Sequence, residues 1–151
     1  MVDLEIRLRD CNKEDYDWCY RLSEDNMKPF VEKHWGKWDP KLFTDNYKTE
    51  RSKMILVDGK KAGFYEIEVI DDLGIIHGIQ ILPEFRGKGI GTKVMVIIEE
   101  EFKKKNARVS RLRVFVDNPA RRLYETLGYK KANIQDAYAK KGTIVMEKII
   151  G

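Results

Sequence analysis

Near the middle of the chain, residues 79–92 read Ile-Gln-Ile-Leu-Pro-Glu-Phe-Arg-Gly-Lys-Gly-Ile-Gly-Thr. The aliphatic residues before Pro83 belong to a predicted strand from Ile75 to Leu82, which the proline ends because it lacks a backbone N–H. A loop follows with three glycines, Gly87, Gly89 and Gly91. Behind it comes a predicted helix whose apolar face is formed by Val94, Ile97, Ile98 and Phe102. The pattern therefore predicts a strand, a glycine loop and a helix in direct succession.

This loop has the chemistry of an anion site. Glycine lets backbone N–H groups turn toward a ligand, and the helix behind adds free N–H groups and the positive end of its dipole. Arg86 and Lys88 bring cations to the same place. The alternative is a plain glycine-rich turn. A nucleotide P-loop is excluded because Thr92-Lys93 stand in the wrong order after Gly91, and the dinucleotide fingerprint fails because its third glycine comes one residue early.

Upstream of the loop, the chain alternates predicted helices and strands. Glu5 to Arg9 has the period of a strand, and Asn12 is a candidate cap for a helix from Lys13 to about Asp25. A second helix is expected to start at Pro29 and a third at Asp39-Pro40. Further predicted elements are a strand over Lys53 to Val57, a turn at Asp58-Gly59, a strand over Lys61 to Ile70 and a turn at Asp71 to Gly74.

Downstream, a strand is predicted around Leu112, Val114 and Val116. Asn118-Pro119 opens a short helix through Leu127, which Gly128 ends. Two last strands are expected near Tyr129 to Ile134 and Thr143 to Ile149. No repeat or linker interrupts the chain, so we predict one α/β domain over 1–151, with a mixed, mostly antiparallel sheet of about seven strands flanked by helices.

Composition narrows the class of protein. The chain has 151 residues, 42% of them hydrophobic and 36% charged, which excludes a disordered chain. No membrane association is expected, because the longest aliphatic run is Val94 to Ile98, far below the roughly 20 residues of a bilayer span. Met1 to Arg9 alternates charge with aliphatics, so no secretory signal is expected. Cys11 and Cys19 lack metal or redox spacing, which predicts free thiols in a reducing cytoplasm.

Charge is divided unevenly along the chain. Residues 1–72 hold 13 Lys/Arg and 17 Asp/Glu, whereas residues 73–151 hold 16 and 8. The division suggests one cationic and one anionic ligand, and the alternative is an uneven surface without a partner. Glu99, Glu100 and Glu101 each precede a lysine by four residues, which indicates a solvated helix end rather than a nucleic-acid site. A nucleic-acid patch, the interpretation we disfavour, would comprise Lys103, Lys104, Lys105, Arg108, Arg111 and Arg113.

Residues 79–92 resemble the acetyl-CoA motif of the GNAT superfamily of N-acetyltransferases. Its core, Arg/Gln-x-x-Gly-x-Gly, is matched by Arg86, Gly89 and Gly91. Residues 118–129, Asn-Pro-Ala-Arg-Arg-Leu-Tyr-Glu-Thr-Leu-Gly-Tyr, are similar to the second GNAT motif. The order of the predicted elements also fits that fold. Residues 27–39 resemble a segment of an uncharacterised bacterial and archaeal subgroup.

The resemblance implies transfer of an acetyl group from acetyl-CoA to a primary amine, small or protein-borne, by direct attack in a ternary complex. It implies acetyl-CoA as co-substrate, no metal, and a homodimer as in many relatives. The acidic excess of residues 1–72 separately suggests that a cationic acceptor docks against that half. Two strands, Ile75 to Leu82 and Leu112 to Val116, are expected to splay where CoA enters. The residues expected to bind CoA are Ile79, Ile81, Arg86, Gly87, Lys88, Gly89, Ile90, Gly91, Thr92, Asn118 and Tyr124.

Among the catalytic groups, Tyr124 is expected to give a proton to the departing CoA thiolate, or else to be a packing tyrosine. The general base is open. His77 is one candidate because histidine is a common proton acceptor near neutral pH, although a buried, hydrogen-bonded core position is the favoured interpretation of this residue. The other candidates are Glu66 and Glu68 on one strand face, and Glu32 and His34 in the substrate-side segment. An amide near Ile81 is the expected donor to the oxyanion.

The sequence departs from the family at two places. Asp117 occupies the position at which many relatives have asparagine, so either Asp117 or Asn118 faces CoA. Gly78 stands where subgroup relatives often have glutamate, which favours an alternative function as a catalytically inactive acyl-CoA-binding sensor or partner protein. The aromatic residues of the first half form either a core stripe or a wall for the acceptor. They are Phe30, Trp35, Trp38, Phe43 and Tyr47.

Overall fold

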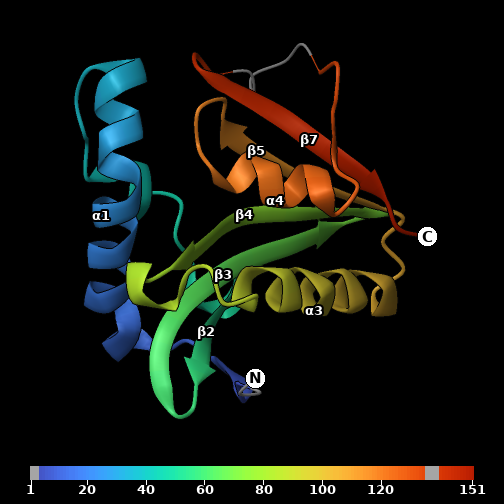
Figure 1. The fold of residues 1–151 in the computed structure, drawn as a ribbon, viewed down its shortest axis with the longest axis horizontal. Helices are drawn as coiled ribbons and strands as arrows, with labels where there is room; N and C mark the ends of the chain where they lie inside the picture. Colours follow the sequence, from blue (N-terminus) through green and yellow to red (C-terminus); the bar gives the residue numbers. More distant parts are fainter. Residues whose placement is uncertain (1–3, 135–139) are drawn as a thin grey trace. The chain divides into compact units, whose positions relative to one another are not determined.

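The computed structural model describes residues 4–134 and 140–151. Its strands are β1 (Ile6–Asp10), β2 (Ser52–Val57), β3 (Lys60–Ile70), β4 (Leu73–Ile81), β5 (Val109–Phe115), β6 (Lys130–Lys131) and β7 (Thr143–Ile149). They are hydrogen bonded in the order β1-β2-β3-β4-β5-β7-β6. Figure 1 labels β2, β3, β4, β5 and β7. Among the pairings whose register is defined, only β4 with β5 is parallel. The predicted mixed, mostly antiparallel α/β sheet is confirmed.

The helices are α1 (Tyr16–Trp35), α2 (Lys41–Thr44), α3 (Ile90–Lys104) and α4 (Ala120–Thr126), with 3₁₀ turns at Lys13–Asp15, Thr49–Arg51 and Pro83–Phe85. The described chain divides into two compact units. The first unit holds residues 4–66 and 78–90, and the second holds residues 67–77, 91–134 and 140–151. The boundary between the two units falls within β3, after Glu66, and within β4, after His77.

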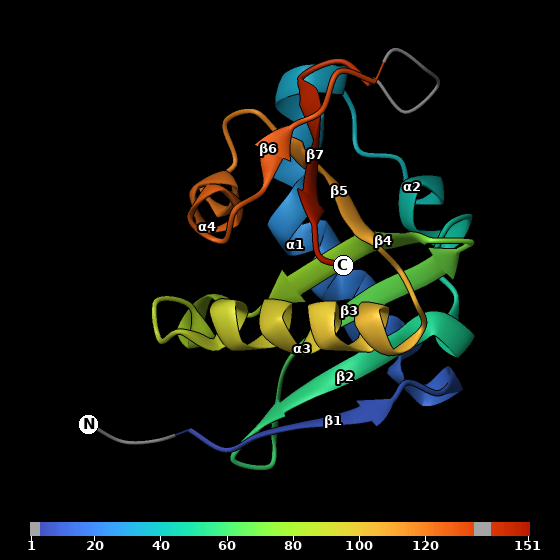
Figure 2. The same cartoon turned by 90° about the vertical axis from the view of Figure 1, so that its right-hand side faces the viewer.

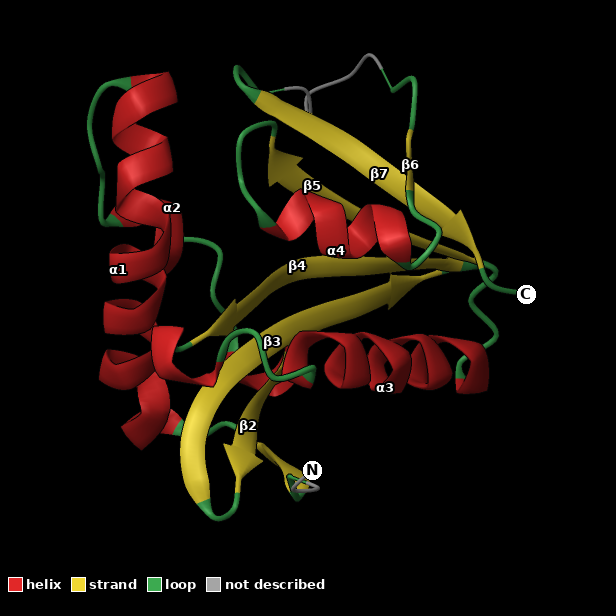
Figure 3. Cartoon of the chain, viewed as in Figure 1, coloured by secondary structure: helices red, strands yellow, loops and turns green. Residues whose placement is uncertain are grey.

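One predicted break is wrong: α1 runs through Pro29 without interruption (Figure 3). A proline inside a helix removes the N–H that would bond the carbonyl four residues earlier. Here that carbonyl belongs to Asp25, and both residues are exposed, so water can satisfy it. The helix ends instead at Gly36, whose φ of 92° suits glycine. The predicted cap, Asn12, closes the 3₁₀ turn that leads into α1, because Asn12 Oδ1 accepts a hydrogen bond from the Glu14 N–H.

The first unit has an aromatic core between α1, α2 and the β2–β3 hairpin. Phe43 stacks on Tyr47 at 4.7 Å between ring centroids and meets Phe64 edge-on. Both cysteines are free and buried in this cluster. Figure 2 shows β1 beside β2, with which it pairs from Ile6 opposite Val57 onward. The core interpretation is therefore right for Phe43 and Tyr47.

A buried ion pair closes the N-terminal end of α1. The Asp15 carboxylate accepts two hydrogen bonds from the Arg9 guanidinium, at 2.8 Å each, and lies 3.3 Å from Lys61 Nζ. These cations, Arg9 first, hold the pKa of Asp15 well below its usual range. The carboxylate therefore stays ionised in the folded protein at neutral pH.

In the second unit, α3 buries three of the four residues predicted for its apolar face. Val94, Met95, Ile98 and Phe102 are fully buried, whereas Ile97 is only partly so. Phe102 lies flat on Gly74, where an added Cβ would come within 2.4 Å of the ring. Gly74 therefore leaves room for Phe102 against β4.

Glu99 does not pair with Lys103 as its spacing predicts. It is buried, accepts hydrogen bonds from Tyr129 Oη at 3.0 Å and Lys148 Nζ at 2.8 Å, and so joins α3 to β7. Lys103 instead lies 3.5 Å from Glu100. Tertiary contacts to two other segments outweigh an exposed pair along the helix, because such a pair stabilises a helix by only about 0.2–0.5 kcal/mol.

Across the described residues, no helix combines the length and apolar character that spanning a bilayer requires.

Candidate active site

The glycine loop has the backbone that an anion site needs. Gly87 and Gly89 have φ values of 73° and 80°, which side chains with a Cβ rarely adopt. A Cβ at either glycine would meet nothing within 4 Å, so the conformation and not the space requires glycine. The N–H groups of Gly87, Lys88 and Gly89 donate to no described residue. With the first turn of α3, which starts at Ile90, they form a set of free donors that fits a diphosphate.

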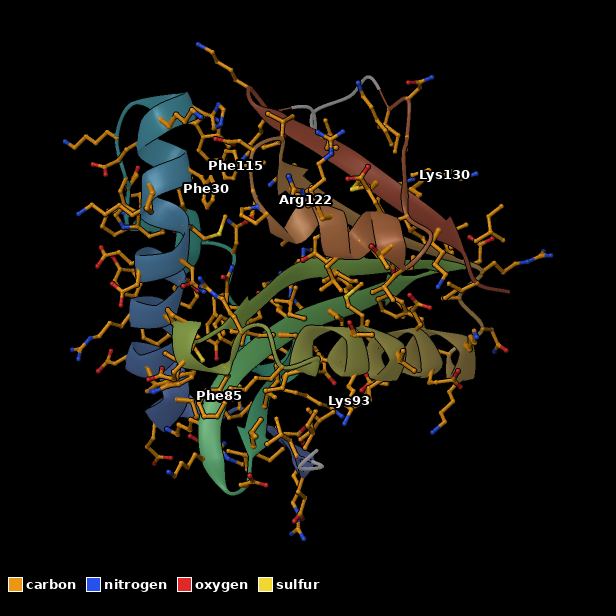
Figure 4. The ribbon with its side chains drawn as sticks, in the orientation of Figure 1. Phe30, Phe85, Lys93, Phe115, Arg122 and Lys130 are labelled. Atoms are coloured by element: carbon orange, nitrogen blue, oxygen red, sulfur yellow. The ribbon has the colours of Figure 1, made fainter. Side chains whose placement is uncertain are left out.

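Arg86 is held within the first unit. Its Nη2 donates to Asn26 Oδ1 on α1 at 2.6 Å, and its Nε donates to the Ile81 carbonyl at 3.2 Å. Lys88 is exposed, and its ammonium lies 5.7 Å from the centre of the Phe85 ring. Figure 4 shows Phe85 on the segment that leads from β4 into the loop. Lys88 is thus the loop cation with the freer side chain.

The end of β4 is positioned by β3. The Leu82 N–H donates to the Ala62 carbonyl at 2.8 Å, and a Cβ on Gly63 would come within 2.1 Å of the Gln80 carbonyl oxygen. The close approach therefore requires glycine at position 63. The parallel ladder between β4 and β5 runs from Leu73 opposite Val109 to Ile76 opposite Leu112. It covers only the first part of each strand.

His77 and Glu68 form a pair on neighbouring strands of the second unit. His77 Nε2 lies 2.8 Å from Glu68 Oε1, and their side chains are 31% and 35% exposed. The core-histidine interpretation is wrong, because this imidazole reaches solvent. When Nε2–H donates to the carboxylate, Nδ1 carries the lone pair. The structure therefore joins two of the candidate bases into one dyad.

The other candidate bases differ in their surroundings. Glu66 is buried, accepts a hydrogen bond from the Lys48 N–H at 3.2 Å and is bound by the Arg51 guanidinium. Both of these contacts join the Glu66 carboxylate to the segment before β2, which they hold in place. Glu32 is exposed and His34 half-buried near the end of α1. The geometry favours the dyad over Glu66.

Tyr124 is buried in α4 and meets the Tyr129 ring edge-on at 6.1 Å between centroids. Its hydroxyl makes no hydrogen bond to a described residue. Burial raises the pKa of Tyr124 to about 12, so the hydroxyl keeps its proton at neutral pH. No group of the described residues uses this hydroxyl, so it is available to a ligand.

Asn118 caps α4, because its Oδ1 accepts a hydrogen bond from the Ala120 N–H at 3.0 Å. Its amide nitrogen remains for a ligand. Around it lies a surface hollow of about 400 Å³ whose lining residues are Val116, Asp117, Asn118, Pro119, Arg121, Arg122 and Glu125. Figure 4 labels Arg122 on α4 and Phe115 at the end of β5, directly before Val116, the first of these lining residues. Both candidates for the CoA-facing position, Asp117 and Asn118, line the hollow.

Of the five aromatic residues considered for an acceptor wall, Phe30, Trp35 and Trp38 are partly exposed. Trp38 donates a hydrogen bond from Nε1 to Tyr20 Oη at 3.3 Å and meets that ring edge-on. Phe30 and Trp35 are half-buried on the last turns of α1. These three rings are therefore placed differently from the core residues Phe43 and Tyr47.

The basic residues of the second half are partly neutralised. Arg111 Nε lies 2.6 Å from Glu147 Oε2 across the β5–β7 ladder, and Lys103 pairs with Glu100. Such pairing disfavours the predicted rival, a phosphate-binding stripe along these residues.

Sequence reasoning missed Asn26. Its amide nitrogen donates to Gln80 Oε1 at 3.0 Å and to the Ile81 carbonyl at 3.2 Å, while its oxygen accepts from Arg86. An asparagine within a helix has low helix propensity and is therefore a weak signal of a tertiary role. That signal is present in the sequence, but its partners lie more than fifty positions away along the chain.

Comparisons with known proteins agree with this geometry. The family model described as "Acetyltransferase (GNAT) family" matches residues 11–129. A relative from Escherichia coli (strain K12), named [Ribosomal protein bS18]-alanine N-acetyltransferase, is 28% identical over 107 residues, which are 70% of this chain and 72% of that protein.

A provisionally named ribosomal protein bS18-alanine N-acetyltransferase of Bacillus subtilis (strain 168) is 37% identical over 82 residues. The match covers 54% of this chain and 54% of that relative, so the chain spans about half the length of that protein. The solved PaiA N-acetyltransferase of Thermoplasma acidophilum, in complex with coenzyme A, superposes with a TM-score of 0.73 at 20% identity. That superposition covers 96% of this chain and 99% of the other, and it shows a shared fold.

Proposed function

The chain belongs to the acetyltransferase (GNAT) family, and from this premise we propose that it moves an acetyl group from acetyl-CoA to a primary amine by direct attack in a ternary complex. The observation that carries the proposal is the glycine loop, whose N–H groups at residues 87–89 donate to no described residue. The family model spans residues of both units, which supports the predicted single N-acetyltransferase domain over 1–151.

Acetyl-CoA, when bound, supplies an activated acetyl thioester. We propose that the loop from Gly87 to Thr92 binds its diphosphate chiefly through backbone N–H groups, with Lys88 as the cation. The Arg86 N–H takes no part, because it donates to the Pro83 carbonyl at 3.1 Å. The backbone of Ile79 and Ile81 extends β4 past its ladder with β5, which suits pantetheine binding as a strand pairs with a strand. An N–H near Ile81 is the proposed donor to the oxygen on which charge develops. Asn118 contributes its free amide.

Two groups of the second unit are proposed to move protons. His77 Nδ1 takes the proton that the attacking ammonium must lose, and Glu68 holds the ring and stabilises the imidazolium that forms. Tyr124 Oη donates to the departing thiolate, because its raised pKa keeps the hydroxyl protonated. Burial raises the pKa of a thiol as it raises that of a phenol, so the two pKa values stay close enough for the phenol to share its proton with the thiolate.

The first test is stabilisation by the cofactor. At ~100 times its dissociation constant, acetyl-CoA is expected to stabilise the protein by about 2.7 kcal/mol, a Tm rise of about 5–10 °C at this chain length. Gly89→Val is expected to abolish the rise, because valine does not adopt the φ of 80° that the loop needs. Differential scanning calorimetry with and without acetyl-CoA measures both.

Gly59→Val is the matched control for Gly89→Val. Gly59 has a φ of 81°, lies in the β2–β3 turn, and its Cβ would also meet nothing within 4 Å. Both variants carry the same backbone strain, but only Gly89→Val is expected to lose the ligand-induced shift. Absence of a shift in the wild-type protein contradicts the cofactor assignment.

The acceptor is proposed to be a cationic amine. Curated relatives are named for acetylating an alanine of a ribosomal protein, which supports a protein amine as one candidate. The acidic excess of residues 1–72 favours a positively charged acceptor. In the same half of the chain, the half-exposed rings of Phe30, Trp35 and Trp38 can contact a cation. A homodimer and a cytoplasmic location remain predictions.

A panel of amines and peptides, assayed by release of free CoA thiol, tests the acceptor. Polyamines and basic peptides are expected to have a lower KM than neutral arylamines, and added salt is expected to raise that KM because it screens exposed charges. A preference for acidic peptides contradicts this expectation.

The same assay separates the rival function, an inactive acyl-CoA sensor or partner. Gly78 favours that rival, since it lacks the acidic side chain although a Cβ there would meet nothing within 4 Å. Stabilisation by acetyl-CoA without thiol release for any amine in the panel would establish the sensor.

A further inference from the structure

Asn26 connects α1 to both ends of the segment between β4 and the glycine loop. Its side-chain amide donates to Gln80 Oε1 and to the Ile81 carbonyl, at 3.0 and 3.2 Å, and its oxygen accepts from Arg86 Nη2 at 2.6 Å. Arg86 Nε in turn donates to the same Ile81 carbonyl at 3.2 Å. The contacts therefore close a ring through Asn26, Ile81 and Arg86. All these residues lie in the first unit.

The ring encloses the turn from which the loop starts. Ile81 is the last residue of β4, and Arg86 is the residue directly before Gly87. Two donors on one carbonyl and a bridge through Asn26 fix the distance between these two points of the chain. The loop itself is exposed, and glycine gives it many accessible conformations. A fixed starting point reduces that freedom before a ligand binds, and such preorganisation raises affinity.

Geometry also assigns the Arg86 guanidinium a role other than that of a simple cation. Its Nε and Nη2 are used in contacts to Ile81 and Asn26, which demand a planar side chain with donors at a fixed angle. Lysine carries the same charge but lacks this fork. Replacing Arg86 with lysine therefore keeps the positive charge but removes the two-point contact to Ile81 and Asn26, so the two roles can be tested separately.

We propose that Asn26 is a positioning residue which, through Arg86, holds the glycine loop in the conformation that binds CoA. The inference rests on the proposed function and adds to it a link from α1 to the proposed cofactor loop. Its consequence is that cofactor affinity depends on a helix residue that itself touches no phosphate.

Isothermal titration of coenzyme A into the folded variants tests the link. Asn26→Leu removes all three hydrogen bonds at similar volume, and Kd is expected to rise about tenfold. Asn26→Asp keeps an acceptor for Arg86 but loses both donations, and Kd is expected to stay within about threefold of the wild-type value. The matched control is Asp25→Leu, at an exposed neighbour on the same helix, with unchanged Kd.

A double-mutant cycle tests whether the effect passes through Arg86. Arg86→Lys is expected to weaken CoA about as much as Asn26→Leu, and the double variant is expected to be no weaker than either single variant. Additive losses, or full affinity in Arg86→Lys, would overturn the proposal. Equal weakness of Asn26→Asp and Asn26→Leu would overturn it as well, because Asn26→Asp keeps the Arg86 contact.

Hydrogen exchange without ligand separates this role from a merely structural one. Asn26→Leu is expected to speed amide exchange at residues 87–91 while the strands β2 and β3 keep their protection. A lower Tm with unchanged Kd and unchanged loop exchange would show that Asn26 only stabilises the fold. If the wild-type protein binds no CoA, the proposed function fails and this role fails with it, whereas normal wild-type binding with unaffected variants refutes Asn26 alone.

Discussion

Tyr124→Phe is expected to lower kcat by about 10²–10⁴-fold, the range typical of a positioned proton donor. The substitution removes only the hydroxyl, which makes no hydrogen bond to a described residue, so packing against Tyr129 should survive. The contact is expected to strengthen as charge develops on the leaving sulfur, whose unperturbed thiol pKa is near 8.5. The loss should therefore appear in kcat, with acetyl-CoA affinity changed by less than about threefold. Steady-state thiol release and CoA titration measure the two quantities.

Tyr129→Phe is the matched control for that experiment. Its hydroxyl donates to Glu99 and lies 2.7 Å from Ser110 Oγ, so its removal should cost about 1–3 kcal/mol of stability without lowering kcat. Full turnover in Tyr124→Phe would make Tyr124 a packing residue. Parallel loss of CoA affinity and turnover would make it a residue that positions the cofactor.

His77→Gln is expected to lower kcat by about 10²-fold or more, because glutamine preserves a hydrogen bond to Glu68 but cannot accept the amine proton. Glu68→Gln should have a smaller effect, since the imidazole remains and loses only the charge that stabilises its protonated form. The measurement is single-turnover acetyl transfer with the best amine of the panel, which isolates chemistry from product release.

The other histidine of the chain supplies the control. His34, on α1, is the rival base from the sequence, and His34→Gln should leave turnover unchanged. A large loss in His34→Gln with normal His77→Gln would transfer the assignment to the substrate-side segment. Normal turnover in both variants would show that water or another group removes the proton.

Much of the site could be predicted because its signals are local. The order of strand, glycine loop and helix over residues 75–104 follows from side-chain periodicity and from the φ angles that only glycine adopts readily. The cap at Asn12 and the short helix after Asn118 likewise depend on neighbours within a few residues. Family membership rests on the same short motifs and is confirmed.

Side-chain pairs between segments distant in the sequence could not be predicted from such local patterns. Glu99 has the spacing of an exposed helix pair, yet its partners Tyr129 and Lys148 come from segments 30 and 49 positions later. The sequence favoured a core position for His77, and only its partly exposed pair with Glu68 shows that this interpretation is wrong. Pro29 met the rule for a helix start, and only the exposure of the affected carbonyl explains why α1 continues.

Local patterns were enough to predict the class of fold, a glycine loop suited to an anion, and Tyr124 as the candidate acid, because each depends on backbone preferences or motifs within a few residues. Tertiary structure alone decided which carboxylates are occupied, which histidine nitrogen is left for a proton, and that Asn26 meets Arg86. These outcomes depend on register between strands and on helix placement. Both are set by the packing of segments tens of residues apart, which no local pattern encodes.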